Sequence, residues 1–176
     1  MRFVVSQAFK IDRKLNNHVD ATRQSKAKFW RMVDEEWDGL KGASGCYVFA
    51  LKTSGGPIPW YVGRAERQSF EKEIFAVHKL HQYDDVLADF KGTPYIFLIP
   101  RMTPTDRLCK PTKSENASIR FLETLLIGMA IRRNPRLKNT KDTTFLRTLS
   151  VRGLLNSDKG HPGGGAIDLK GTLGIK

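Results

Sequence analysis

The stretch GCYVFALKTSGGPIPWYVGRA, residues 45–65, decides the fold of this chain. Its two flanks, residues 45–51 and 58–63, are rich in aliphatic and aromatic side chains and have the length of β-strands. Between them, residues 53–57 (Thr-Ser-Gly-Gly-Pro) have the composition of a turn. The stretch therefore predicts a β-hairpin.

The segment before the hairpin favours a helix over residues 20–40, for which Asp20 is a candidate cap. Large apolar side chains recur there at three- and four-residue steps, as on one helix face: Phe29, Trp30, Val33 and Trp37. Trp30 and Trp37 lie seven residues apart, so they either pack onto the domain or form the contact of a homodimer. Ahead of this helix, residues 3–5 (Phe-Val-Val) favour a short strand.

After the hairpin, helical spacing over residues 69–82, which 84–90 can continue, precedes a strand at 95–100. A polar loop follows, and then a helix that Ser114 or Asn116 can cap and that Pro135 ends near Arg133. We expect one more helix over residues 140–155 and irregular, flexible structure in the glycine-rich tail after it.

This order predicts an α/β (α+β) fold, with a small three-stranded sheet flanked by helices and preceded by an N-terminal helix. The expected parts are an N-terminal helical extension (1–42), a central domain (43–140), and a C-terminal helix with a flexible tail (141–176). A length of 176 residues suits one main domain. A hydrophobic content of 40% excludes a disordered chain.

The net charge is +12, from 30 Lys+Arg against 18 Asp+Glu, and residues 101–153 hold 12 of the basic and only 4 of the acidic side chains. Such an excess indicates a nucleic-acid partner, with DNA expected first, rather than a membrane. The longest apolar run, residues 125–131, is far below the roughly 20 residues of a membrane span. The residues expected to contact phosphates, unless they only form a solvated surface, are Arg132, Arg133, Arg136, Lys138 and Lys141.

The cysteines and the first residues bear on the compartment. Cys46 and Cys109 give neither a disulfide framework nor a zinc site. Arg2 and the polar residues 6–14 interrupt any apolar start, so no secretory signal is expected. We therefore expect a cytoplasmic protein.

Two tyrosines and one glutamate are the first candidates for chemistry. Tyr47 and Tyr61 lie in adjacent predicted strands, where they either converge on one face or serve as packing residues with a hydrogen-bonded tip. Glu123 lies in a helix that is apolar on most sides, and burying a carboxylate is costly unless it is paired or metal-bound. Its simplest alternative role is an ion pair with Arg120.

Taken in order, these residues resemble the GIY-YIG nuclease domain over about residues 43–140. The resemblance rests on Gly45-Cys46-Tyr47, then Tyr61-Val62-Gly63, then Glu123, and finally Asn139 after Asn134-Pro135-Arg136-Leu137. It implies an endonuclease that hydrolyses DNA phosphodiester bonds with one divalent metal, Mg²⁺ or Mn²⁺. Glu123 would be the only protein carboxylate on that metal.

The resemblance also implies roles for the neighbouring residues. Tyr47 would activate or orient the attacking water, with Tyr61 beside it. Arg64 would help the tyrosine to lose its proton and would stabilise charge on the scissile phosphate. Asn139 would hold the geometry of the metal site or contact the backbone.

Two departures leave a second reading open. Cys46 stands where isoleucine is typical. Many members carry an arginine about ten residues after the second tyrosine, with Tyr or His one turn later, whereas this chain has Glu71 and Phe75 there. The replacements would be Lys72 or Arg67 for the cation and His78 for the ring.

If nothing replaces them, the chain is a catalytically degenerate nucleic-acid-binding module on the same fold. A basic interaction protein, for example one that associates with ribosomes, would need only the net charge.

Overall fold

The structure is a computed structural model that describes residues 2–140, 143–154 and 162–174. The chain divides into two compact units, Met1–Asn139 and Thr140–Lys176. Residues 1–42 therefore belong to the same unit as the hairpin.

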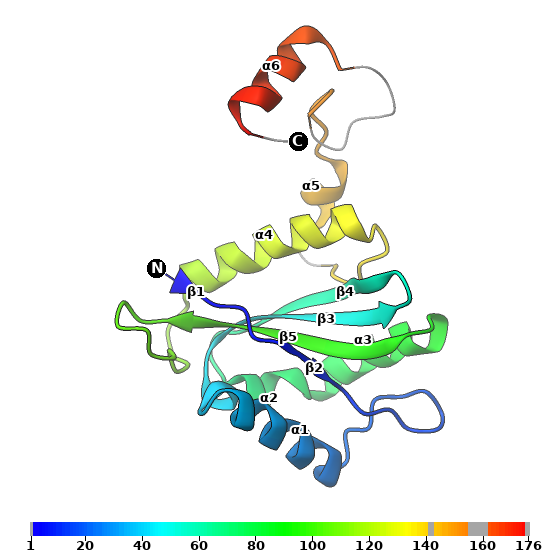
Figure 1. Cartoon of the computed structure of the whole chain (residues 1–176), viewed down its shortest axis with the longest axis vertical. Coiled ribbons are helices and arrows are strands. Elements are labelled where there is room, and N and C mark those ends of the chain that lie inside the picture. Colours follow the sequence, from blue (N-terminus) through cyan, green and yellow to red (C-terminus); the bar gives the residue numbers. More distant parts are fainter. Residues whose placement is uncertain (1, 141–142, 155–161, 175–176) are drawn as a thin grey trace. The chain divides into compact units, whose positions relative to one another are not determined.

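The first unit is built on an antiparallel sheet whose central strand is β3 (Gly45–Thr53). β3 pairs with β4 (Gly56–Ala65), its hairpin partner, and with β5 (Thr93–Met102). Two short strands, β1 (Arg2–Phe3) and β2 (Ala8–Lys10), both pair with β5, which leaves β4 at one edge of the sheet (Figure 1).

The predicted mixed α/β class and the β-hairpin are confirmed, but the prediction of three strands is wrong because the sheet has five. β1 and β2 are two and three residues long, too short to show an alternating pattern of their own. They exist as strands because β5 offers them a row of backbone partners.

Helices cover both faces of the sheet. α1 (Arg23–Glu36), α2 (Phe70–Ile74) and α3 (Val77–Asp89) lie on one face, together with a single 3₁₀ turn at Leu40–Gly42. α4 (Ala117–Arg133) lies on the other face (Figure 1).

At the starts of α1 and α4, polar side chains accept hydrogen bonds from backbone N–H groups that have no partner within the helix. Asn116 caps α4, as predicted, by accepting hydrogen bonds from the N–H groups of Ser118 and Ile119. The cap of α1 is Thr22 rather than Asp20. The Asp20 carboxylate instead accepts from the backbone of Thr22 and the hydroxyl of Ser25.

The alternation of β3 assigns each of its side chains to one of the two layers. Tyr47, Phe49 and Leu51 belong to the core under α1, α2 and α3. Cys46 and Val48 belong to a smaller cluster with Ile119 of α4. The sheet thus separates two layers, and the pleat decides which layer a residue can serve.

The two tryptophans of α1 and its C-terminus pack onto the domain. Trp30 is buried in the core, and Trp37 is partly buried and packs against it. Both tryptophans therefore pack onto the domain, which is one of the two roles expected for them.

The second unit contains α5 (Thr143–Thr148) and α6 (Gly164–Thr172). The helix expected over residues 140–155 is confined to α5 in the part that the structure describes. The tail, for which irregular structure was expected, holds the nine-residue helix α6. None of the helices in the described ranges has the length and apolar character needed to cross a bilayer.

One close approach fixes the hairpin. The ring of Tyr47 lies against Gly63, its register partner on β4. A Cβ atom at Gly63 would lie 2.3 Å from Cζ of Tyr47 and 2.4 Å from its Oη. No side chain fits at this position unless the ring moves.

We expect Gly63→Ala to lower the free energy of unfolding by about 2 kcal/mol or more, because it overpacks a buried contact. Urea denaturation measures this change. The control is Gly42→Ala, since nothing lies within 4 Å of a Cβ built there. If the clash is with the ring, the cost of Gly63→Ala disappears in a Tyr47→Ala background. An equal cost in both backgrounds would contradict this explanation.

Candidate active site around strand β4

Strand β4 presents candidate side chains to both faces of the sheet. Tyr61 is paired with Phe49 and belongs to the core under α1, α2 and α3. Arg64 is paired with Cys46, which belongs to the layer of α4. The structure therefore places Tyr61 and Arg64 in different layers although only two residues separate them.

On the α4 side, Glu123 forms an ion pair with Arg64, whose Nη1 donates to the carboxylate. The side chains are 16% and 26% exposed, so solvent and ions can reach the pair. Arg120, the partner considered from the sequence, instead contacts Glu66 and Glu115. The structure thus brings together two of the predicted site residues, one from the hairpin and one from the apolar helix.

A second carboxylate, Glu66, lies on the other side of Arg64. Its side chain is buried and forms an ion pair with Arg64, whose Nε lies 3.3 Å away, and it accepts a hydrogen bond from Nε of Arg120 at 3.3 Å. The backbone N–H of Asn116, at the start of α4, also donates to it. These donors offset the cost of burying the charge.

The network continues outward to the surface. Arg120 also binds Glu115, and this hydrogen bond lowers the pKa of the Glu115 carboxyl. Arg67 reaches Glu115 at 2.8 Å. Positive and negative side chains therefore alternate from Arg67 to Glu123 along the junction of β4 and α4.

On the opposite face, the tyrosines form an aromatic cluster. The ring centroids of Tyr47 and Tyr61 are 6.2 Å apart, as are those of Tyr61 and Tyr83. Tyr47 and Tyr83 are fully buried, and neither hydroxyl has a hydrogen-bond partner of good geometry among the described residues. Burial raises the pKa of both phenols well above the usual value, which opposes the use of Tyr47 as a base.

Tyr61 differs from the other two tyrosines because it has a cationic partner. Nζ of Lys79 donates to its hydroxyl at 2.5 Å and also lies 3.3 Å from a carboxylate oxygen of Glu73. Tyr61 is 7% exposed, whereas Tyr47 is 0% exposed. The two tyrosines are adjacent, as predicted, but both lie across the sheet from Glu123.

The cation beside Tyr61 is Lys79 and not one of the residues expected from the sequence. Lys72 and His78 are exposed to solvent, and Arg67 pairs with Glu115. Tyr83 lies one turn after Lys79 on α3, and its ring centroid is 6.2 Å from that of Tyr61.

Lys79 lies 18 residues after Tyr61, well beyond the spacing of about ten residues on which the expectation rested. The chain also has a break between Ile74 and Val77, where one continuous helix was expected. The spacing therefore gave no signal that pointed to Lys79.

The segment after α4 is fastened to the outer edge of β4. Asn139 accepts from the N–H of Val62 at 2.9 Å and donates to its carbonyl at 2.7 Å. Asn134 donates to the carbonyl of Pro59 at 2.8 Å, and the N–H of Lys138 donates to that of Trp60 at 2.9 Å. Of the two roles expected for Asn139, the structure provides the backbone contact.

The basic residues expected to bind phosphates have different surroundings. Arg132 and Arg133, in the last turn of α4, are exposed. Arg136 lies over the rings of Phe90 and Trp60, at 4.6 and 5.7 Å from their centroids. Two predicted residues remain: Lys138 lies 3.8 Å from Asp89, and Lys141 falls outside the described residues.

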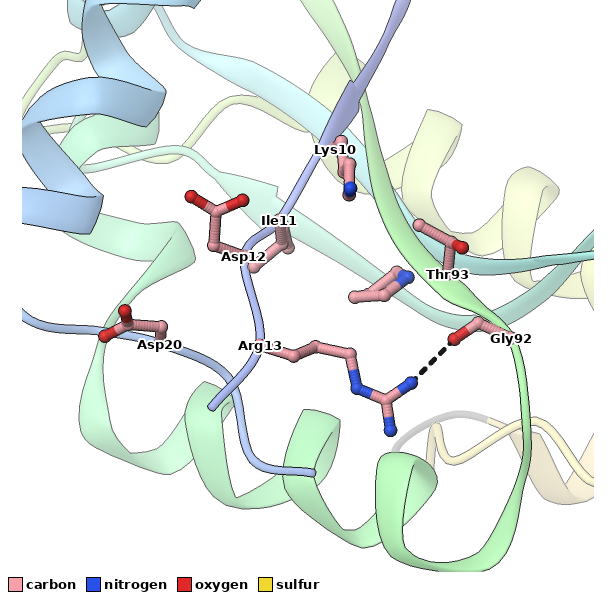
Figure 2. A pocket seen from close by; sticks show the side chains of 8 residues that line it. Lys10, Ile11, Asp12, Arg13, Asp20, Gly92 and Thr93 are labelled. Carbon is pink, nitrogen blue, oxygen red and sulfur yellow. Dashed lines mark hydrogen bonds between the residues drawn. The ribbon is translucent and has the colours of Figure 1, made fainter. Parts of the chain in front are cut away.

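Two cavities in the described part of the chain lie apart from these residues. One, of about 490 Å³, lies between the end of β2 and the start of β5, and Figure 2 shows the charged side chains that line it. Arg13 in this cavity donates to the carbonyl of Gly92 at 2.8 Å, and Asp12 pairs with Lys28. A second cavity, of about 510 Å³, is lined by Trp37, Glu71 and Arg107 among others. Neither contains a predicted site residue.

The donor set at Glu123 suits a hard divalent cation, because carboxylate oxygens are the ligands that Mg²⁺ and Mn²⁺ prefer. Within the described ranges, no three or more His, Cys, Asp or Glu side chains gather as a metal site. A single carboxylate would leave the other ligand positions to water, which Mg²⁺ accepts readily.

When compared with models of protein families, with curated proteins and with solved structures, the chain matches none of them.

We expect Asn139→Ala to lower the free energy of unfolding by about 2 kcal/mol, because it removes both partners of the buried Val62 backbone. Urea denaturation at neutral pH measures this loss. Asn16→Ala is the matched control, since Asn16 is exposed and accepts one long bond of 3.3 Å from His18. Equal stability of the two variants would contradict the structural role of Asn139.

Proposed function

We propose that the protein is a metal-dependent endonuclease that hydrolyses phosphodiester bonds in DNA, with a GIY-YIG-like site. The observation that carries this proposal is the contact between Arg64 and Glu123. It joins the cation that follows Tyr61-Val62-Gly63 to the carboxylate of the apolar helix, the two residues to which the resemblance assigns the phosphate and the metal.

Each role in the proposal follows from a residue's surroundings. Glu123 would hold the cation, which when bound polarises a phosphoryl oxygen and makes its water a better nucleophile. Arg64 would bind the oxygens of the scissile phosphate through its planar guanidinium. We assign no catalytic role to Tyr61 or Tyr47, because both lie across the sheet from Glu123 and the hydroxyl of Tyr47 is buried.

The rest of the DNA contact would lie along α4. Arg132 and Arg133 lie nine and ten residues beyond Glu123, about 14–15 Å along the helix axis at 1.5 Å per residue. At 3.6 residues per turn Arg133 is the one nearer to the helix face of Glu123. Both are exposed and can neutralise phosphates on one side of the cleaved bond.

A second candidate is a protein that binds nucleic acid without cleaving it. It is favoured by the placement of both tyrosines across the sheet from Glu123. It keeps the basic residues of α4 and dispenses with the metal.

The first test is the nicking of supercoiled plasmid in the presence of Mg²⁺. Glu123→Gln is expected to slow nicking about 100-fold or more, because the carboxylate on the cation is lost. Glu115→Gln removes the same charge from a residue that pairs with Arg120 and Arg67, and it is expected to nick at the wild-type rate. Tyr47→Phe is also expected to keep its activity.

Equal nicking by the wild type and Glu123→Gln would reject the endonuclease. DNA binding that falls with salt, without any nicking that depends on Mg²⁺, would establish the second candidate instead.

The DNA-contact surface is tested by the salt dependence of binding. The double variant Arg132→Gln/Arg133→Gln is expected to bind all DNA sequences more weakly, and the slope of log K against log[salt] should fall by about 2. The control is Arg23→Gln/Arg31→Gln, which removes the same charge from exposed positions of α1. If both double variants lose the same slope, the cations of α4 have no special part in binding.

A further inference from the structure

We propose, on the basis of the proposed function, that Arg64 is a switch residue that links cation binding at Glu123 to phosphate binding. Without a divalent cation, its guanidinium occupies the carboxylate of Glu123. When the cation binds the carboxylate of Glu123, Glu66 keeps the guanidinium of Arg64 in place. The outer nitrogens of that guanidinium then become available to a phosphate.

The first step is that one guanidinium is shared by two carboxylates. Nη1 of Arg64 donates to Glu123, and Nε lies 3.3 Å from Glu66. A guanidinium is a rigid planar fork whose nitrogens can serve different partners at the same time. Loss of one partner therefore need not release the other.

The second step is that the two carboxylates differ in their exposure to solvent. The Glu66 side chain is 6% exposed and also accepts from the Asn116 backbone and from Arg120. The Glu123 side chain is 16% exposed. Glu66 is thus a fixed anchor for Arg64, whereas the end at Glu123 is the one that solvent and ions can reach.

The third step is competition. A guanidinium and a divalent cation both require the carboxylate oxygens of Glu123, and two positive groups a few ångströms apart repel each other. The presence of Arg64 therefore weakens cation binding, and a phosphate that draws Arg64 away strengthens it. Because linkage is reciprocal, cation and DNA should each raise the affinity for the other.

The test measures Mn²⁺ binding to the full chain without DNA, by the electron paramagnetic resonance signal of the free ion. Arg64→Gln is expected to bind Mn²⁺ about tenfold more tightly than the wild type, because the competitor is gone. Arg67→Gln removes the same charge from a side chain that pairs with Glu115, and its affinity should change less than about threefold.

Glu66 is tested in the same way. Glu66→Gln is expected to weaken Mn²⁺ binding about threefold relative to Glu115→Gln. Of the two carboxylates that pair with Arg64, this variant keeps only Glu123, so Arg64 competes more strongly with the ion for it. Thermal denaturation checks that each variant is folded. Arg64→Lys, which keeps the charge without the fork, should bind Mn²⁺ more tightly than the wild type and less tightly than Arg64→Gln.

The outcomes separate the two proposals. If the wild type binds Mn²⁺ and Glu123→Gln does not, but Arg64→Gln binds no more tightly than Arg67→Gln, the switch is overturned and the endonuclease stands. If the wild type does not bind Mn²⁺, or if Glu123→Gln binds it as well as the wild type does, the metal site and the switch are both rejected.

Discussion

The packing of the Tyr47 ring against the bare backbone of Gly63 is the constraint on which the hairpin depends. It fixes which residue of β4 stands opposite which residue of β3, because a slip by one residue would turn every side chain to the other face. With this register, Tyr61 enters the aromatic core and Arg64 meets Glu123. The contact between Tyr47 and Gly63 therefore decides which side chains of β4 lie on each face of the sheet, although neither residue takes part in the proposed reaction.

The sheet separates two kinds of interior. Under α1, α2 and α3 it covers an aromatic core in which phenols are kept protonated by burial. On the face that α4 covers, positive and negative side chains form a network of ion pairs that is partly exposed to solvent. Of the residues that resemble a nuclease site, the charged pair lies where an ion and a phosphate can reach it. The first tyrosine, Tyr47, is buried on the opposite face of the sheet.

Much of the fold followed from the sequence, because the hairpin, β5, α1 and α4 show the hydrophobic patterns of strands and helices. The start of α4 is also marked by its cap, Asn116. β1 and β2 were not predicted as they are, since they are too short to show a pattern and pair with a strand that is distant in sequence. Lys79 was missed because it lies 18 residues after Tyr61, beyond the expected spacing of about ten. Residue spacing alone could not show that Tyr61 and Glu123 face different layers, which depends on the register and on the side of the sheet that α4 covers.

The hydrogen bonds of Asn139 to Val62 have a consequence for association between molecules. A side-chain amide offers one donor and one acceptor, the same pair as a peptide group, so it imitates one residue of a neighbouring strand. Together with Pro57 and Pro59, which have no N–H to offer, it denies a foreign strand the row of partners that nucleates fibrous aggregates. The outer edge of β4 is therefore less open to pairing with a strand of another molecule.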